Sequence, residues 1–97
     1  MQVQLRLYGV FRSTAGASSL TVEIPENAPT VKSAIEQIFA QGEFGALRSL
    51  LINSATSDPR PNALIMVSGR EINTLKGLET ELTEGDELAL LPVAHGG

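Results

Sequence analysis

The sequence contains no cysteine, no tryptophan and a single histidine, His95. The absence of cysteine excludes disulfides and thiolate metal sites, and it is compatible with a reducing cytoplasm. One histidine cannot form a histidine cluster for a metal, and no serine lies in a Gly-x-Ser-x-Gly elbow that would present it as a nucleophile. We therefore predict no catalytic residue and no metal ligand, and we expect His95 to be solvated.

Positive charge is also scarce. The chain has seven Lys and Arg residues against eleven Asp and Glu, which gives a net charge of −4. The basic residues are scattered, so no basic stripe is available to follow phosphates, and we expect no nucleic acid binding. No glycine-rich phosphate loop occurs either, so we expect no bound nucleotide or other cofactor.

Long apolar runs are missing as well. Residues 1–8 alternate polar and apolar side chains and do not form the apolar region of a signal peptide. No later stretch approaches the length that crosses a membrane. We therefore expect a cytoplasmic protein without membrane contacts.

The apolar residues that are present suffice for one core. A chain of 97 residues with 42% hydrophobic content suits a single domain over residues 1–97. The odd positions of residues 2–8 are apolar, which predicts a half-buried strand. Residues 20–24 alternate in the same way up to Pro25, and residues 11–19 have the composition of a hairpin-type loop. The two strands should pair antiparallel.

A helix is predicted after this hairpin. Thr30 suits the N-cap position, and apolar residues at helical spacing follow it as far as Phe39. Gly42 is placed to adopt the left-handed conformation that ends many helices. A second short helix or turn is expected at residues 44–51. Residues 53–62 have almost no apolar content and predict an exposed, mobile loop.

The C-terminal half predicts further strands. Residues 63–67 form an apolar, β-rich run that ends at the turn Ser68-Gly69. We expect short strand or 3₁₀ pieces over residues 70–82, and Gly85 suits a turn with positive φ before the last strand, 87–91. The order β-β-α-β-(short β)-β indicates an α+β fold with the main helix on one face of the sheet. A helical crossover would allow the first and last strands to pair in parallel.

One hydrophobic core is expected between helix and sheet. Its predicted members face inward on the strands or lie on the helix stripe: Leu5, Leu7, Val22, Ile24, Ile35, Ile38, Phe39, Ile65, Val67, Leu82, Leu88 and Leu90. The same alternation turns Leu64 and Met66 outward. We predict that Met66, Ala89 and Leu91 form an exposed apolar patch that marks a binding site, unless the 53–62 loop covers it.

The end of the chain has an unusual composition, Pro92-Val93-Ala94-His95-Gly96-Gly97. Glycine has the largest backbone entropy and no side chain to anchor it. We therefore expect residues 92–97 to project from the domain as a flexible tail that can enter a narrow channel in a partner. On the two glycines alone, a frayed end is the more frequent explanation, and a terminus presented for chemistry is the alternative.

Residues 82–97 closely resemble the ending of the small sulfur-carrier proteins of the MoaD/ThiS type, which have the β-grasp, ubiquitin-like fold. This group includes the small subunit of molybdopterin synthase, the thiamine-pathway sulfur carrier and the archaeal and eukaryotic ubiquitin-related modifiers. The shared features are a leucine, a Gly-Asp turn, an apolar strand, a proline-containing tail and a terminal Gly-Gly. Two shorter segments are also similar to the family: Tyr8-Gly9-Val10-Phe11-Arg12 to its aromatic-Ala-x-x-Arg motif, and Val67-Ser68-Gly69 to its Val-Asn-Gly turn.

The resemblance implies a fold and a chemistry. The fold is a mixed sheet of four or five strands with one main helix packed on one face. The chemistry takes place at the carboxylate of Gly97, which is a poor acyl donor because its leaving group would be oxide. The resemblance therefore implies a separate E1-like enzyme that uses ATP to adenylate this carboxylate, after which attack by sulfur gives a thiocarboxylate.

The resemblance leaves the acceptor open between several outcomes. We favour the precursor of molybdopterin, with the chain as the non-catalytic small subunit of molybdopterin synthase beside a large subunit, because the tail most resembles that subunit. Thiolation of tRNA is another use of the thiocarboxylate, and attack by an amine instead of sulfur would give an isopeptide bond to a target lysine. From another class, the chain could be a non-covalent β-grasp interaction module in which the Gly-Gly is incidental. The predicted site residues are the activated terminus Gly97, the tail-threading residues Gly96, His95 and Ala94, and the partner-binding residues Leu91, Met66, Ala89 and Pro92.

Overall fold

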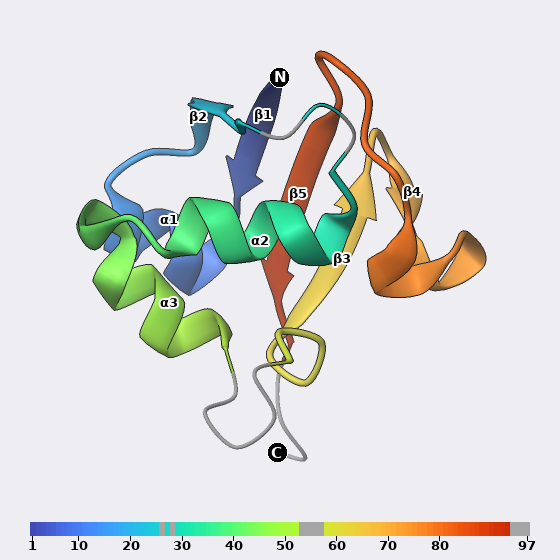
Figure 1. The fold of residues 1–97 in the computed structure, drawn as a ribbon. Helices are drawn as coiled ribbons and strands as arrows, with labels where there is room; N and C mark the ends of the chain where they lie inside the picture. The colour runs from blue at the N-terminus through green and yellow to red at the C-terminus, as the bar shows by residue number, and fades with distance from the viewer. Residues whose placement is uncertain (26, 28, 53–57, 94–97) are drawn as a thin grey trace.

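A five-stranded mixed sheet with the main helix on one face forms the fold in the computed structural model (Figure 1). The structure describes residues 1–25, 27, 29–52 and 58–93. The strands are β1 Gln2–Leu7, β2 Ser19–Glu23, β3 Ala63–Val67, β4 Arg70–Glu71 and β5 Glu87–Pro92, in the sheet order β2-β1-β5-β3-β4. The helices are α1 Gly9–Ala15, α2 Val31–Phe39 and α3 Gly45–Leu51, with 3₁₀ turns η1 Gly42–Phe44, η2 Ile72–Thr74 and η3 Gly77–Glu79. The predicted α+β class and strand order are confirmed.

The register of the central strands confirms the predicted pairing. β1 pairs antiparallel with β2 and parallel with β5. Leu5 is aligned with Leu88, and Leu7 with Leu90. β3 runs antiparallel to β5 on its other side and aligns Ile65 with Leu90. Because side chains at aligned positions lie on the same face of a sheet, these residues form one apolar layer beneath α2.

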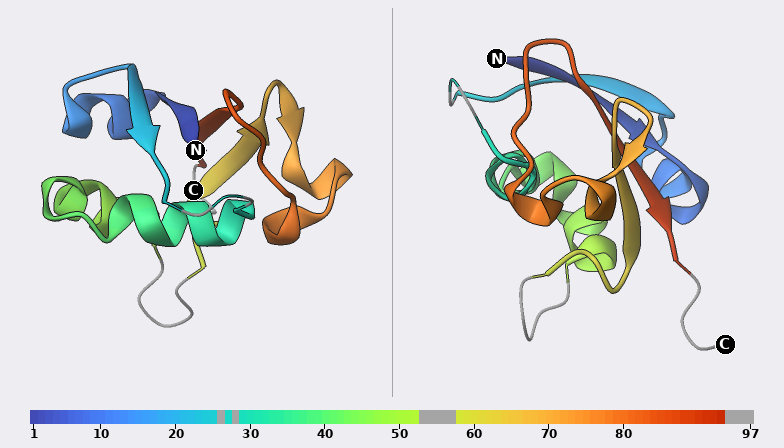
Figure 2. Two further views of the ribbon diagram at one scale, coloured as in Figure 1. Left: turned by 45° about the horizontal axis from the view of Figure 1, so that its top comes forward. Right: turned by 90° about the vertical axis from the view of Figure 1, so that its right-hand side faces the viewer.

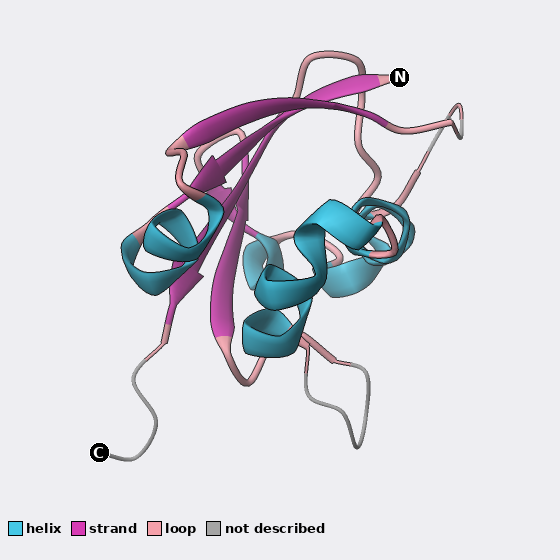
Figure 3. Ribbon diagram, turned by 90° about the vertical axis from the view of Figure 1, so that its left-hand side faces the viewer, coloured by secondary structure: helices cyan, strands magenta, loops and turns pink. Residues whose placement is uncertain are grey.

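Two helices cover this layer. α2 and α3 lie on the same side of the sheet (Figures 2 and 3). All the predicted core residues are buried in a single cluster, together with Phe44, Leu47 and Leu51 from the η1–α3 segment. The rings of Phe39 and Phe44 meet edge to face, with their centres 5.7 Å apart. This contact packs the end of α2 against the start of α3. The sequence predicted α3 as a second short helix or turn over residues 44–51.

The start of α2 follows the prediction from Thr30. The backbone N–H of Ser33 donates to the Thr30 hydroxyl at 3.2 Å, and the Thr30 N–H donates to the Ser33 hydroxyl at 2.9 Å. This reciprocal pair is a capping box, which satisfies backbone donors that the first turn of a helix leaves free. The predicted end of the helix at Gly42 is wrong. The residue that caps the end of α2 is Ala40, which has a right-handed backbone conformation. Gly42 is the first residue of η1 and does not have a positive φ.

The predicted hairpin loop over residues 11–19 is also wrong in its first half, which forms α1. Phe11 is only 2% exposed and belongs to the core, and α1 contacts both α3 and β5. Gly16 ends the helix with a φ of +74°. The Ser, Thr, Gly and Ala content of this segment is typical of a loop, but burial of one aromatic ring stabilises a short helix at this end of the sheet.

The remaining turns agree with the sequence. Ser68 and Gly69 have φ values of +46° and +85° and connect β3 to β4, and Gly85 has a φ of +83° before β5. In the described part of the 53–62 loop, Pro59 is buried and Asn62 donates from its side-chain amide to the Leu51 carbonyl at 3.0 Å. The predicted full exposure is therefore wrong for this end of the loop, because it packs beside α3. Among the described residues, no helix is long and apolar enough to cross a bilayer.

Candidate functional site

The sheet face turned away from α2 carries the residues that were predicted to contact partners. Along β5, Leu88 and Leu90 point into the core, so Ala89 and Leu91 lie on the opposite face. Ala89 is aligned with Met66 of β3, and Leu91 is aligned with Leu64. The register thus brings the predicted β3 and β5 residues together on one surface.

Further apolar side chains extend this surface toward the end of β5. Val93 continues the ladder, because its N–H donates to the Asn62 carbonyl at 3.1 Å. Tyr8 follows β1, and its N–H donates to the Leu90 carbonyl at 3.3 Å, which places Tyr8 next to Leu91 in the row. Tyr8, Leu64, Met66, Leu91 and Val93 together are termed the outer apolar face.

The exposure of these residues corrects the predicted patch. Leu64 and Val93 are 38% and 43% exposed, whereas Met66 and Leu91 are half-buried and Ala89 is buried. Ala89 carries only a methyl group and is aligned between two long side chains, Arg6 on β1 and Met66 on β3. Its neighbours shield it from solvent, so the accessible part of the face lies closer to the chain end than the sequence indicated.

Arg6 forms a charged border to the outer apolar face. Its guanidinium lies 3.7 Å from the Glu87 carboxylate and 5.8 Å from the centre of the Tyr8 ring. An exposed ion pair of this length contributes little to stability. The main effect of the ion pair is to hold the Arg6 side chain beside Ala89, with which Arg6 is aligned. The Arg6 charge then lies beside the Tyr8 ring.

Pro92, the last residue of β5, lies in close contact with the start of α1. It is exposed and aligned with Ala63. A β-carbon added to Gly9 would come within 2.6 Å of the Pro92 Cγ, and Gly9 has a φ of +55°. Both the backbone conformation and the available space at this position therefore require glycine. Residues 92 and 93 were predicted to belong to the flexible tail, but Pro92 belongs to β5 and Val93 continues the pairing with the β3 side of the sheet.

The structure brings together only part of the predicted site. Leu91 and Met66 lie on the outer apolar face, and Ala89 is buried between its neighbours on the same face. Pro92 is aligned with the buried Ala63, so the alternation along β5 directs it away from this face, and the prediction that it joins the other three is wrong. The last four residues of the predicted tail, Ala94, His95, Gly96 and Gly97, lie outside the described residues, so their roles stay predictions. Sequence reasoning missed Val93 and Tyr8 as members of the face, although continuing the alternation of β5 by one step would have found Val93.

Comparison with known proteins finds one matching family model, described as the ThiS family, over residues 5–97. The small archaeal modifier protein 3 of Haloferax volcanii is 29% identical over 97 residues, and the match covers 100% of both chains. Among solved structures, SAMP1 of Haloferax volcanii has a TM-score of 0.81 at 23% identity and 100% coverage of both chains. A chain of the Amycolatopsis orientalis BexX/CysO complex has a TM-score of 0.69 at 23% identity, covering 98% of this chain and 99% of the other. These similarities confirm the predicted β-grasp, ubiquitin-like fold.

Proposed function

Because the chain belongs to the ThiS family, we propose that it is a sulfur carrier whose Gly97 carboxylate is adenylated and then converted to a thiocarboxylate. The observation that carries the proposal is the extent of the family match, which runs through β5 and on to residue 97. The matched region includes both the outer apolar face and the terminal Gly-Gly. The chain itself acts as a carrier, not as a catalyst.

The proposed chemistry divides the work between this chain and an activating enzyme. The chain supplies the carboxylate, and the E1-like partner binds ATP. An oxygen of the Gly97 carboxylate attacks the α-phosphorus of ATP and pyrophosphate leaves. A hydrosulfide ion, HS⁻, then attacks the acyl carbon of the adenylate, AMP leaves with the electron pair, and loss of the S–H proton gives the thiocarboxylate. Adenylation is needed because AMP is a far better leaving group than oxide.

The outer apolar face is the proposed docking surface for these partners. It contains apolar side chains that are exposed on a small domain, a feature that marks binding sites when the side chains are contiguous. Leu91 and Val93 are followed closely by residues 94–97, so a partner that covers them would also receive the terminus. Since one surface would serve both the activating enzyme and the sulfur-using partner, the two would bind in turn.

As acceptor we propose the precursor of molybdopterin, with the large subunit of molybdopterin synthase as the sulfur-using partner. The support is the resemblance of residues 82–97 to the ending of the small subunit of that synthase. The geometry of the domain is compatible with any acceptor enzyme that binds the outer apolar face and leads the tail into its active site.

A second function, covalent modification of proteins, is favoured by the full-length similarity to the small archaeal modifier protein 3. In this case the amine of a target lysine attacks the same adenylate, AMP leaves, and an isopeptide bond joins the lysine to Gly97. The two functions share the activation step and differ only in the nucleophile.

Mass spectrometry of the protein purified from its own cells tests the proposal. A mass increase that corresponds to exchange of one oxygen for sulfur at the terminus is expected for the carrier. Gly97 linked to lysine side chains of other proteins is expected for the modifier. An unmodified terminus under all growth conditions would contradict both and leave the non-covalent interaction module.

A second experiment tests the activated terminus directly. Adding one residue after Gly97, or the substitution Gly96→Val, should abolish ATP-pyrophosphate exchange with the activating enzyme without changing the circular dichroism spectrum. Gly42→Val is the matched control, because an added side chain at this exposed turn would meet open space. Undiminished exchange with the extended chain would show that the free Gly97 carboxylate is not the reacting group.

A further inference from the structure

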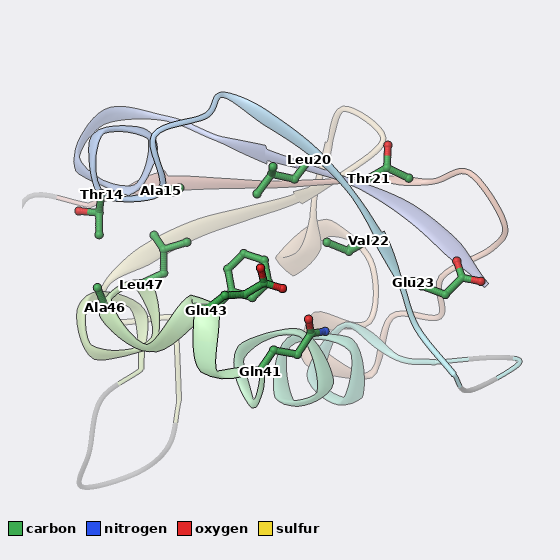
Figure 4. A pocket seen from close by; sticks show the side chains of 11 residues that line it. Thr14, Ala15, Leu20, Thr21, Val22, Glu23, Gln41, Glu43, Ala46 and Leu47 are labelled. Carbon is green, nitrogen blue, oxygen red and sulfur yellow. The ribbon is translucent and has the colours of Figure 1, made fainter.

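A groove on a different part of the molecule opens between β2 and the segment that joins α2 to α3 (Figure 4). Its volume is about 420 Å³. Leu20 and Val22 line it from the strand, and Phe44 and Leu47 line it from the helical side. Val22, Phe44 and Leu47 are nearly fully buried, whereas Leu20 is half-buried. The groove therefore has a small apolar floor, of which Leu20 is the most accessible part, within a largely polar rim.

The backbone of β2 is open along this groove. β2 lies at the edge of the sheet, and among the described residues it pairs with β1 alone. Met1 and Ile24 exchange two backbone hydrogen bonds of 2.8 and 2.7 Å at one end of the pair, and Leu7 donates to Ser18 at 2.9 Å at the other. Bonded positions alternate in an antiparallel pair, so Thr21, midway along β2, points its backbone N–H and C=O away from the sheet.

By the same alternation, Ser19 and Glu23 also direct their backbone groups outward, and all three of these residues are exposed. Such a row of free donors and acceptors, spaced two residues apart, matches the backbone of an extended peptide. An extended peptide that pairs with β2 would place every second side chain on the groove side of the sheet, above the apolar floor.

The charge around the groove is of one sign. Glu23 lies on the strand side of the rim and Glu43 on the helical side (Figure 4). The described residues that line the groove include no lysine or arginine. Neither Glu23 nor Glu43 forms a salt bridge with a described residue. The rim is therefore complementary to a cationic partner.

We propose that this groove binds an extended, basic segment of a partner protein, which pairs with β2 and inserts apolar side chains between β2 and α3. The open backbone of β2 selects an extended chain, the apolar floor selects alternating apolar residues, and the two carboxylates select flanking lysine or arginine. A second copy of this chain is a poorer occupant, because pairing β2 with β2 would bring like-charged rims together. The groove shares no residue with the outer apolar face, so a partner could bind here while the tail is in use.

The probe for this proposal is a short synthetic peptide with lysine at both ends and alternating threonine and valine between them, capped at both termini. On titration into the isotope-labelled protein, the amide signals of Thr21 and Glu23 should shift, and their hydrogen exchange should slow. Methyl signals of Leu20 and Leu47 should shift with them. Shifts confined to the outer apolar face, or no shift at the solubility limit of the peptide, would overturn the proposal.

Charge reversal provides the matched comparison. The double variant Glu23→Lys/Glu43→Lys should bind the lysine peptide more weakly, by about fivefold for each charge. It should bind a peptide with glutamate in place of both lysines more tightly than the unaltered protein does. If both proteins bind both peptides with equal affinity, Glu23 and Glu43 do not select a basic segment, which contradicts the proposal. ATP-pyrophosphate exchange should be unaffected, which separates this proposal from the proposed function.

The substitution Thr21→Pro tests the strand pairing. Proline is tolerated on an edge strand where the lost N–H points to solvent, so the sheet should persist. Peptide affinity should fall roughly two- to tenfold, as for loss of one backbone hydrogen bond. Thr21→Val is the control, because it keeps the N–H and removes only the two side-chain hydrogen bonds with Gln4, which Thr21→Pro removes as well. Equal affinity of the two variants, or dimerisation of the free protein through β2, would refute binding of a partner segment at this edge.

Discussion

Gly9 and Pro92 are packed against each other so closely that a single β-carbon on Gly9 would lie 2.6 Å from the Pro92 Cγ. One residue begins α1 and the other ends β5, so the contact joins the first connection of the chain to the last strand. The outer apolar face lies beside this junction. The junction therefore has both a structural role and, in the proposed function, a role in placing the tail.

The substitution Gly9→Ala is expected to destabilise the domain more than Gly16→Ala. Both glycines have positive φ, but an added β-carbon meets nothing within 4 Å at Gly16. Gly16→Ala should therefore cost about 1 kcal/mol or more of unfolding free energy for the backbone alone. Gly9→Ala should add the cost of displacing the Pro92 ring. Urea denaturation of both variants measures the difference.

A double-mutant cycle assigns this extra cost to the ring. Pro92→Ala removes Cγ, so the combination Gly9→Ala/Pro92→Ala should recover the part of the loss that exceeds that of Gly16→Ala. Equal losses for the two glycine variants, or strict additivity in the cycle, would show that Pro92 yields without cost.

Substitutions on the outer apolar face are expected to weaken partner binding. Leu64→Lys should reduce the affinity for the activating enzyme and for the sulfur-using partner by roughly 2 kcal/mol or more, as for an interface anchor. Leu91→Lys should have the same effect, with some loss of stability because Leu91 is half-buried. Isothermal titration calorimetry with each partner measures the change.

Leu50→Lys is the matched control for that experiment. Leu50 is 39% exposed and Leu64 is 38% exposed, but Leu50 lies on α3, on the opposite side of the sheet. It should leave both affinities unchanged. If Leu50→Lys weakens binding as much as Leu64→Lys does, the partners do not recognise the outer apolar face in particular.

The core is expected to be most sensitive at the central strand. Leu90 is 1% exposed and is aligned with Leu7 on one side and Ile65 on the other. Leu90→Ala should cost roughly 2–5 kcal/mol, since it removes buried methyl groups and leaves a cavity. Leu64→Ala, on the solvent face of the next strand, should cost about 1 kcal/mol at most. A smaller loss for Leu90→Ala than for Leu64→Ala in thermal unfolding would mean that the register of β5 is inverted.

The segment before β3 is expected to respond to acid through Asp58. The Arg60 side chain donates to the Asp58 carboxylate at 2.7 Å, and this hydrogen bond lowers the pKa of Asp58. A carboxyl whose pKa is lower in the folded state stabilises that state above its unfolded pKa of about 3.9 and loses this effect as the pH falls through the folded value.

The destabilisation caused by Asp58→Asn should therefore be present at neutral pH and fade below about pH 4. It should be small throughout, because the Arg60 side chain is exposed and water screens the pair. Chemical unfolding at a series of pH values measures it, with Arg60→Gln as the companion variant. A destabilisation that persists unchanged at low pH would assign the effect of Asp58 to packing and not to its charge.

Several features of this protein could be predicted from local sequence alone. The alternation at Leu88 and Leu90 determines which face of β5 is buried, because a strand has a period of two residues whatever its neighbours are. Thr30 followed by Ser33 determines the start of α2, because a capping box uses only groups within one turn. Residues 82–97 likewise indicated the class of protein, because the resemblance depends on the local order of turn, apolar strand, proline and terminal Gly-Gly.

Other features were decided by contacts between residues far apart in the chain. The segment around Phe11 has a loop-like composition but forms the helix α1. It does so because α1 packs against α3 and β5, where the Phe11 ring is buried. Ala89 is shielded because the register places Arg6 and Met66 on either side of it. Gly9 must be glycine because of Pro92, and the groove exists because the edge of β2 lies opposite α3. The spacing of residues along a strand or helix determines which way a side chain points, but only the tertiary structure determines which residues it contacts.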